Sequence, residues 1–476
     1  MITHVIDGEA RKAADGGTFE TVDPWRQAPW EEVARGTRDD VDAAVAAARR
    51  AFADGPWPRM GYAERGRILH RLADLIEANA GSLAEADTSD MGKPLSDMLA
   101  KDVPRAAQNF RFFADHARLS TADAYPMDSP HHAYTRYEPV GVVAAIAPWN
   151  FPLMLETWKV APPLAWGNTV VLKPAEDTPA SATLLAQLAL DAGMPPGVLN
   201  VVHGNGADAP GQWLTEHPDV DRITFTGESA TGRAIARAAA ANLTPVSFEL
   251  GGKGANVVFA DADLGKAVDW SLKAIFTNAG QVCLAGSRLY VECPVFDEFL
   301  GRFVAAAESM RAGDPRDSAI QVGPLASAQH YAKVTGYLDG LASDGGGEVL
   351  CGGALGDGTW VVRPTVIVGA PEDARICREE VFGPVVTVAP FDGEDEAVRL
   401  ANDTPYGLNA MLFTENVRRA HRVAGRLRAG TVWVNCFFVR DLRAPFGGVG
   451  DSGIGREGGD FSREFCTEPK AVVMEL

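Results

Sequence analysis

The sequence lacks the features of a membrane-spanning or disulfide-linked protein. Its six cysteines are scattered without a closely spaced pair, which argues against both a disulfide framework and a zinc site. The longest run without a charged residue covers residues 139–155 and contains prolines and Asn150, so it is too short and too irregular to cross a bilayer. We find no internal repeat and no low-complexity segment.

Positive charge is also scarce. The chain has 44 Lys and Arg against 63 Asp and Glu, a formal net charge of -19, and this balance argues against nucleic acid and anionic membranes as partners. Charged residues follow soon after Met1, so we see no apolar signal region and expect a cytoplasmic protein. The isolated pair His131 and His132 predicts no metal site.

The chain is long enough for several domains. With 476 residues, of which 46% are hydrophobic, it predicts about three domains with large cores. Helical patterns at residues 40–52 and 65–86 alternate with short apolar runs at 198–202 and 257–259, which is typical of an α/β protein. Glycine-rich stretches at 344–347 and 352–358 are expected to form surface loops.

Three short segments together predict nucleophilic catalysis at a carbonyl carbon. Cys283 stands in GQVCLAGSR (280–288) between small residues that admit a substrate, and a thiolate attacks carbonyl carbon well. Glu249 is followed at once by a Gly-Gly turn that lets the backbone approach a ligand. Asn150 lies between two prolines that hold its amide rigidly. Taken alone, each residue could have a purely structural role: Cys283 as a buried thiol, Glu249 as an exposed carboxylate on a turn, and Asn150 as an amide that caps a turn.

These three side chains can carry out one reaction. The Cys283 thiolate would attack an aldehyde, and the Asn150 amide with the Cys283 backbone N–H would stabilise the oxygen that becomes negative. No residue of the chain can accept the hydride, so the reaction requires a nicotinamide cofactor. Glu249, with its pKa raised by burial, would then activate water to hydrolyse the thioester on Cys283 and release a carboxylic acid.

With these motifs the chain resembles the NAD(P)-dependent aldehyde dehydrogenase superfamily, in which the residues matching Cys283, Glu249 and Asn150 are the nucleophile, the general base and the oxyanion-binding amide. The resemblance extends from VIDGE (5–9) to PFGG (445–448). It implies a Rossmann-type NAD-binding domain at 1–120 and 141–250, an α/β catalytic domain at 251–450, and a β oligomerisation element at 121–140 and 465–476. A homodimer or homotetramer is implied.

The cofactor residues come partly from the sequence pattern and partly from the resemblance. Residues 225–238 predict a strand, a glycine turn and a helix whose N-terminus suits a pyrophosphate. Glu176 would bind the adenosine ribose and, by repelling an added phosphate, favour NAD over NADP. Glu228 stands where the superfamily usually has serine, and Gly206 lies in a loop that could equally be a plain turn. The implied contacts are Trp149, Lys173, Glu176, Gly206, Gly227, Glu228, Gly232, Leu250, Glu380 and Phe382.

The substrate is predicted from arginines. The loop NCFFVRDLRAPF (435–446) contains two of them, and guanidinium groups suit carboxylate recognition. The pattern resembles the branch that acts on 2-hydroxymuconate and 2-aminomuconate semialdehydes. We expect Arg111 and Arg443 to bind the distal carboxylate of such a small-molecule aldehyde, although a surface ion pair of Arg443 with Asp441 is the alternative. Trp166 stands where the superfamily usually has a small residue, and the sequence does not show whether it narrows the substrate pocket.

Other functions compete with this hypothesis. A related branch takes the carboxymethylated hydroxymuconate semialdehyde, and a general aldehyde dehydrogenase would not need the arginines. CoA-dependent acyl transfer is disfavoured by Glu249, which supplies a base for water. A non-catalytic binding or structural protein on the same fold is disfavoured by the intact Cys283, Glu249 and Asn150.

Overall fold

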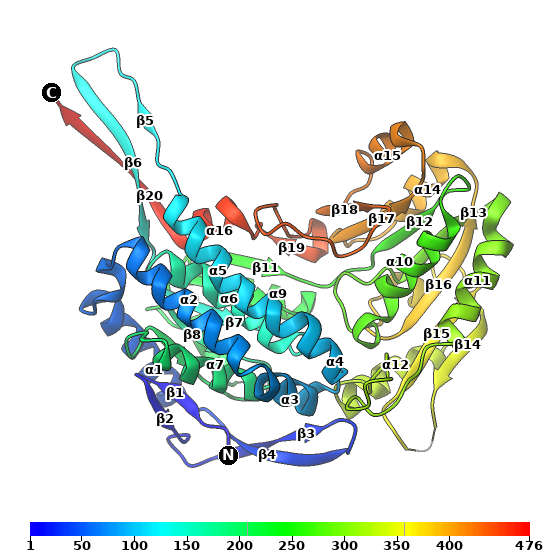
Figure 1. Ribbon diagram of the computed structural model, residues 1–476, viewed down its shortest axis with the longest axis horizontal. Coiled ribbons are helices and arrows are strands. Elements are labelled where there is room, and N and C mark those ends of the chain that lie inside the picture. Colours follow the sequence, from blue (N-terminus) through cyan, green and yellow to red (C-terminus); the bar gives the residue numbers. More distant parts are fainter. Residues whose placement is uncertain (207, 357) are drawn as a thin grey trace.

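The computed structural model describes residues 1–206, 208–356 and 358–476. Its elements form two sheet-and-helix bodies side by side, and a narrow β arm projects from one of them (Figure 1). The α/β class predicted from the sequence is confirmed. A separate hairpin near the N-terminus consists of β3 (Thr18–Asp23) and β4 (Ala28–Ala34).

The first body contains an eight-stranded sheet in the order β19-β11-β10-β7-β8-β9-β1-β2. Its five central strands are parallel. The order reverses between β7 and β10, and in open α/β sheets ligands bind in the crevice beyond the carboxyl ends of the strands at such a point. The strands are β1 (His4–Ile6), β2 (Glu9–Arg11), β7 (Val142–Ile146), β8 (Thr169–Lys173), β9 (Leu199–Val201), β10 (Arg222–Thr226), β11 (Val246–Glu249) and β19 (Gly453–Ile454).

Helices cover both faces of this sheet, so its strands are buried runs rather than alternating ones. In β8, Val170 and Leu172 belong to one core and Val171 to the other. The first core is closed by α2 (Tyr62–Ala78), α3 (Ala80–Met91), α5 (Val103–Leu119), α6 (Pro152–Ala165) and α7 (Ala180–Asp191), and the second by α1 (Arg38–Ala53), α8 (Pro210–Glu216) and α9 (Ser229–Ala240).

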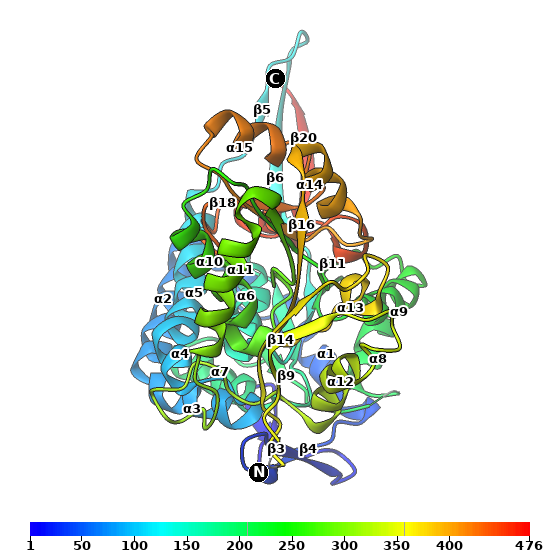
Figure 2. The same ribbon diagram turned by 90° about the vertical axis from the view of Figure 1, so that its right-hand side faces the viewer.

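The second body contains a seven-stranded sheet in the order β14-β15-β16-β13-β12-β17-β18, parallel except for β14. Helices α10 (Leu264–Phe276) and α11 (Phe296–Glu308) pack side by side over one face (Figure 2). The other helices here are α12 (Ala328–Asp339), α14 (Gly393–Asn402) and α15 (Val417–Ala424). The strands are β12 (Ala255–Val258), β13 (Arg288–Glu292), β14 (Glu348–Ala354), β15 (Val362–Val368), β16 (Val385–Phe391), β17 (Asn409–Phe413) and β18 (Thr431–Val434).

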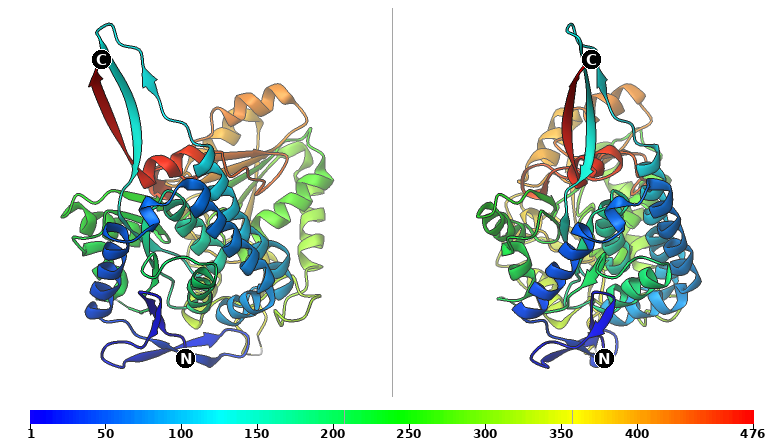
Figure 3. Two further views of the ribbon diagram at one scale, coloured as in Figure 1. Left: turned by 60° about the vertical axis from the view of Figure 1, so that its left-hand side comes forward. Right: turned by 90° about the vertical axis from the view of Figure 1, so that its left-hand side faces the viewer.

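The projecting arm is a three-stranded antiparallel sheet in the order β20-β6-β5 (Figure 3). It joins β5 (Ala124–Tyr125) and β6 (His131–Pro139) to the last strand, β20 (Thr467–Glu475). The hairpin and strand expected in this part of the chain are therefore present. Strand β20 lies at the edge, and its Val473 and Met474 are exposed.

Two local predictions were wrong. The helix predicted at 65–86 is two helices, because Asn79 between α2 and α3 leaves helical geometry and its side-chain amide donates to the Leu75 carbonyl, a local bond that competes with the helix. Glycines 352 and 353 lie in β14 rather than in a loop. Their φ angles of +99° and +83° accompany register shifts in that strand, as in a bulge.

Short elements complete the described chain: α4 (Leu95–Asp97), a π-helical turn (Met98–Asp102), α13 (Arg375–Arg378) and α16 (Gly459–Cys466). Within the residues that the structure describes, none of the helices has the length and apolar character needed to span a bilayer. The same residues contain no group of three or more His, Cys, Asp or Glu placed to hold a metal ion.

Candidate active site

The three predicted catalytic residues come from three separate segments: two lie at or after the carboxyl end of a strand, and the third lies in the segment before a strand. Asn150 follows β7, Glu249 is the last residue of β11, and Cys283 lies between α10 and β13. The Asn150 amide donates to the Gln281 carbonyl, two residues before Cys283, at 2.9 Å. A side chain at Gly252 would meet the Cys283 carbonyl, so the Gly-Gly turn after Glu249 brings the backbone against the thiol loop.

The Asn150 amide is held by contacts on both sides. It is buried, and its main-chain carbonyl accepts a hydrogen bond from the Asn278 side chain at 2.7 Å. Asn278 itself has φ +52°, the left-handed region that asparagine tolerates better than most residues. A primary amide has two N–H donors, of which Gln281 takes one. The second has no partner among the described residues and can stabilise a developing oxyanion.

Glu249 is a buried carboxyl suited to proton transfer. Burial first, and then the neighbouring Glu457, raise the Glu249 pKa to about 8, against the opposing effect of Lys159 and Arg440. Its Oε2 atom is buried and has no hydrogen-bond partner among the described residues. A carboxyl with a pKa near the operating pH can take and return a proton efficiently.

Two functional neighbours of Glu249 were missed by sequence reasoning. Glu457 is held by the Trp158 indole N–H and by the Lys159 Nζ, both at 2.5 Å. Lys159 is buried on the mainly apolar helix α6, which also carries the buried Glu156. A charge on such a helix is the signal that could have revealed the pair, since buried charges are normally paired. Lys159 and Glu457 thus form a buried ion pair beside Glu249.

The Cys283 thiol is half-buried. Burial first, and then the carboxylates of Glu249 and Glu380, raise the pKa of Cys283, whereas Arg440 opposes them. The sulfur is therefore protonated at rest, and Glu249 is the neighbouring group able to take its proton when an electrophile arrives.

Several of the predicted cofactor residues follow the carboxyl ends of β7, β8 and β10, beside the topological switch point. Trp149 follows β7 and packs edge to face against Phe382, with ring centres 5.3 Å apart. Glu380 accepts a hydrogen bond from the Gly252 N–H at 2.8 Å, and its pKa is raised to about 7 by burial. Together the two aromatic rings and this carboxyl form one wall.

The opposite side of the crevice is the turn between β10 and α9. Glu228 is the N-cap residue of α9, exposed and without a side-chain cap, so the first N–H groups of the helix are free for an anion. A side chain at Gly232 would lie 2.8 Å from Leu250, which explains the glycine as close packing of helix on strand. Gly227 donates its N–H to the Glu249 carbonyl at 3.0 Å.

The remaining cofactor candidates lie along the neighbouring strand ends. Lys173 ends β8, and its Nζ is 3.2 Å from Glu176, whose carboxylate is half exposed. This charged pair is accessible to a ligand that carries hydroxyl groups. Gly206 has φ +85° with open space around it, which agrees with a turn, and residue 207 lies outside the described residues.

The structure places both arginines of the predicted substrate clamp elsewhere. Arg111 donates to Glu77 and Asp74 on the outer surface of α2. Arg443 is 75% exposed and pairs with Asp441 at 2.6 Å, the alternative stated above for it. Each guanidinium is thus already bound to a carboxylate of this chain, and we correct the assignment of the clamp to Arg111 and Arg443.

Two other arginines lie at the site instead. Arg440 is held between the rings of Trp158 and Phe446, 4.8 and 3.6 Å from their centres, and one of its guanidinium nitrogens is buried without a partner among the described residues. Burial first, and then Arg105, lower the Arg440 pKa to about 10. Burial likewise lowers the pKa of the half-buried Arg105. Two neighbouring guanidinium groups that meet no carboxylate among the described residues form an anion site.

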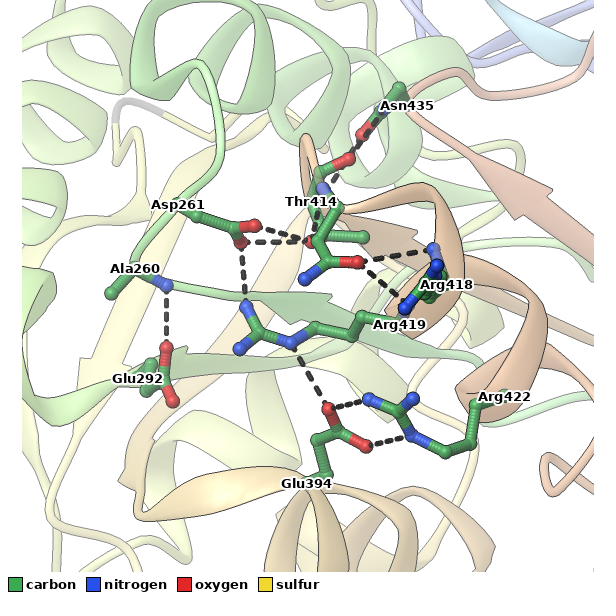
Figure 4. A network of polar contacts seen from close by, with 10 residues as sticks. Ala260, Asp261, Glu292, Glu394, Thr414, Arg418, Arg419, Arg422 and Asn435 are labelled. Atoms are coloured by element: carbon green, nitrogen blue, oxygen red, sulfur yellow. Dashed lines mark hydrogen bonds and ion pairs between the residues drawn. The ribbon is translucent and has the colours of Figure 1, made fainter.

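The loop that carries Arg440 is anchored at its base. Asn435, directly after β18, exchanges two hydrogen bonds with the Thr414 backbone, and the Thr414 hydroxyl donates to Asp261 (Figure 4). Arg419 links Asp261 to Glu394 in the same network. Further along, the Trp433 indole donates to the Val439 carbonyl at 2.9 Å. Arg440 therefore projects from a fixed loop.

Trp166 does not belong to this site. It is buried at the end of α6, where it packs edge to face against Phe113 and His116 of α5. The large ring therefore fills the space between two helices, and the substitution affects helix packing rather than the lining beside Cys283.

Comparison with known proteins decides the family. Residues 11–472 match the Aldehyde dehydrogenase family. The chain belongs to this family. It is 50% identical to the 2-hydroxymuconic semialdehyde dehydrogenase of Pseudomonas sp. (strain CF600), with 100% of this chain and 99% of that protein covered.

Two further relatives agree with this result. The chain is 48% identical to a 2-aminomuconic 6-semialdehyde dehydrogenase of Pseudomonas sp., covering 96% of this chain and 95% of that one. Among solved structures, the P. syringae indole-3-acetaldehyde dehydrogenase AldA with NAD+ and IAA superposes with a TM-score of 0.98 at 41% identity, covering 100% and 97%. The predicted aldehyde dehydrogenase fold is thus confirmed.

Proposed function

We propose that this aldehyde dehydrogenase uses NAD to oxidise a carboxylate-bearing semialdehyde of the 2-hydroxymuconate type. One observation carries the proposal: Arg440 lies near Glu249 and Cys283, Arg105 lies near Arg440, and neither guanidinium forms an ion pair with a carboxylate among the described residues. Buried charge is costly unless it is compensated, and a carboxylate at the far end of the substrate would supply the compensation. The names of the two semialdehyde dehydrogenases among the relatives support this choice.

The residues of the chain perform the following steps. Glu249 takes the Cys283 proton, and the sulfur attacks the aldehyde carbon while the free Asn150 N–H stabilises the oxyanion. When bound, NAD accepts the hydride that leaves this carbon. Glu249 loses the thiol proton to solvent and, as a carboxylate again, takes a proton from water; the water oxygen adds to the thioester carbon, the Cys283 sulfur leaves as the thiol, and the acid is released. Arg105 and Arg440 hold the distal carboxylate during these steps, so that the aldehyde stays aligned with the sulfur.

NAD fits the crevice described above. The free N-terminus of α9 suits the pyrophosphate, the wall of Trp149, Phe382 and Glu380 suits the nicotinamide ribose, and Glu176 suits the adenosine ribose. A carboxylate in this last position disfavours the extra phosphate of NADP. The NAD+ in the P. syringae relative supports the same choice.

The Glu249 pKa predicts how the rate depends on pH. A general base must be deprotonated, and the folded-state pKa of about 8 lies above the usual value, so the active form is lost as pH falls through about 8. We expect kcat to fall about tenfold for each pH unit below about 7. Steady-state NADH formation between pH 5.5 and 9.5 measures this limb. A flat profile between pH 6 and 8 would show that Glu249 is not the base in turnover.

Substitution of Arg440 tests the substrate assignment. Arg440→Met keeps the packing between Trp158 and Phe446 but removes the charge, and we expect KM for 2-hydroxymuconate semialdehyde to rise about 100-fold, as for loss of one buried charged contact. KM for a neutral aliphatic aldehyde should change less than about threefold. Arg443→Met is the matched control from the same loop and should change neither value. An equal rise for both substrates would refute carboxylate recognition by Arg440.

A carboxymethylated hydroxymuconate semialdehyde remains the rival substrate. It carries an additional carboxylate, so it would need a further cation beyond Arg105 and Arg440. The same assays with this analogue separate the two: the proposal requires a higher kcat/KM for the compound without the carboxymethyl group.

We further propose that the chain assembles as a homodimer or homotetramer through the projecting arm. Strand β20 is an edge strand with free backbone groups and exposed apolar side chains, and such edges need a partner. The division into an NAD-binding domain at 1–120 and 141–250 and a catalytic domain at 251–450 stays part of this proposal, with Asn150 and Glu249 contributed to the site by the first of these domains. A cytoplasmic location stays a prediction.

A further inference from the structure

One buried lysine has no part in the chemistry described so far. Lys93 follows α3, and its side chain is 1% exposed. Its Nζ lies 2.5 Å from the Asp102 carboxylate and 4.1 Å from the centre of the Phe151 ring. A fully buried ion pair contributes little to stability after desolvation of both charges, so stability alone does not account for its presence.

One partner of Lys93 fixes the helix that carries Arg105. Asp102 ends the π-helical turn (Met98–Asp102) and is the N-cap residue of α5. Arg105 lies in the first turn of that helix, three residues further on. Single π-helical turns occur mainly at functional sites, and here the ammonium of Lys93 holds the end of the turn.

The other partner of Lys93 fixes the loop that carries Asn150. Phe151 follows Asn150 directly and is the N-cap residue of α6, with no side-chain cap of its own. Asp87 on α3 supplies the missing acceptor, because its carboxylate receives the Leu153 N–H at 3.1 Å. The Lys93 ammonium over the Phe151 ring adds a cation–π contact. The Lys93 backbone is in turn fixed by the Thr88 hydroxyl, which donates to its carbonyl at 3.0 Å.

A second contact joins the same two helices further along. The Asn109 amide on α5 donates to the Met154 carbonyl and the Thr157 hydroxyl of α6, at 3.2 and 3.0 Å. Its oxygen accepts from the Arg105 Nε at 3.3 Å. Arg105 lies on α5 and Asn150 directly precedes the N-cap residue of α6, and these two helices are joined by Asn109. Lys93 contacts the N-terminal ends of both helices.

We infer that Lys93 is a positioning residue, which sets the separation between the oxyanion-binding amide of Asn150 and the carboxylate-binding guanidinium of Arg105. The Arg105 side of this inference rests on the proposed function, whereas the Asn150 side does not. A substrate with an aldehyde at one end and a carboxylate at the other is aligned only if these two groups keep a fixed distance, and small displacements are costly to the rate.

The test removes both charges, since removal of one would leave the other buried and uncompensated. In the Lys93→Met/Asp102→Asn variant, kcat for a neutral aliphatic aldehyde should fall about tenfold, because the Asn150 amide is displaced. KM for 2-hydroxymuconate semialdehyde should rise about tenfold in addition, so that the preference for the carboxylated substrate falls by the same factor. Rates are expressed per Cys283 titrated by alkylation, which removes the effect of any unfolded fraction.

Two further variants keep the inference falsifiable. Lys93→Arg retains a cation that can lie over the Phe151 ring and should keep the substrate preference within about threefold of the wild type. Asp90→Asn is the matched control: Asp90 is buried on the same helix but bonds to Thr21, Trp30 and the Ala180 N–H, and it should lower the melting temperature with the preference unchanged.

A double variant that melts at a lower temperature yet keeps wild-type kcat and preference per titrated thiol would overturn the inference and leave Lys93 a structural residue. Failure of the proposed function looks different. In that case the wild type itself would show no preference for the carboxylated substrate, and the loss of kcat on the neutral aldehyde would still decide whether Lys93 positions Asn150.

Discussion

Cys283→Ala is expected to lower kcat for aldehyde oxidation by about 10⁴-fold or more, since the covalent route requires a nucleophile and no other group can replace it. The loss concerns chemistry and not binding. The Asn150 amide and the arginine pair are untouched, so the dissociation constant of the aldehyde, measured by calorimetry, should change less than about threefold. Stopped-flow detection of NADH measures both the initial burst and the steady-state rate, and both should be absent in Cys283→Ala.

The matched control is Cys436→Ala. Cys436 is a half-buried thiol in the loop that carries Arg440, and its replacement should leave kcat within about threefold of the wild type. If Cys283→Ala retained a tenth of the wild-type rate, or if Cys436→Ala abolished activity, the nucleophile would be misassigned.

Glu249→Gln is expected to lower steady-state turnover about 10³-fold, within the range for loss of a general base. Glutamine keeps the shape and the neutral state that Glu249 has below its pKa of about 8, but it cannot accept a proton. Because a thiol ionises far more readily than water, deacylation should slow more than the attack by Cys283, and the thioester on Cys283 should accumulate. Added hydroxylamine, which cleaves thioesters without a base, should raise turnover of the variant at least about tenfold, and mass spectrometry should detect the acylated thiol.

The control for this variant is Glu379→Gln. Glu379 is exposed and accepts from the Tyr337 hydroxyl at 2.7 Å, outside the reacting groups, and its change should leave turnover unaltered. Turnover of Glu249→Gln within threefold of the wild type, or insensitivity to hydroxylamine, would show that another residue activates the water.

The candidate catalytic residues could be selected from the sequence because their backbone geometry depends on nearby residues. Gly-Gly after Glu249 and the prolines around Asn150 determine backbone geometry within a few residues, and the strand, turn and helix at β10 and α9 follow from a pattern of the same length. At these positions a few neighbouring residues determine the relevant property. The Gly-Gly turn allows close approach of the backbone, the prolines make the Asn150 segment rigid, and the turn before α9 leaves a free helix N-terminus.

The proposed substrate residues Arg105 and Arg440 depend on long-range packing, which sequence reasoning could not evaluate when it chose Arg111 and Arg443. Arg105 and Arg111 are six residues apart on α5, so at 100° per residue they project about 120° apart around the helix. Only the fold shows that Arg111 meets Glu77 on α2. Arg440 and Arg443 share a loop, and the difference between them is that Asp441 pairs with the second while Trp158 and Phe446 enclose the first.

The same reason explains why Lys93 could not be recognised from the sequence. Its partners are Asp102 and Phe151, and no local pattern shows that the segments around these residues meet. The same holds for Lys159 and Glu457, which lie 298 positions apart along the chain.

The most direct test of this account is kcat/KM of the wild type with NAD for freshly prepared 2-hydroxymuconate semialdehyde, measured beside a neutral aliphatic aldehyde of similar length. Because Arg105 and Arg440 form no ion pair with a carboxylate of the described residues, we predict a preference of at least about 100-fold for the semialdehyde. Equal values for the two aldehydes would keep the thiol mechanism of Cys283 and Glu249 but contradict recognition of the substrate by Arg105 and Arg440.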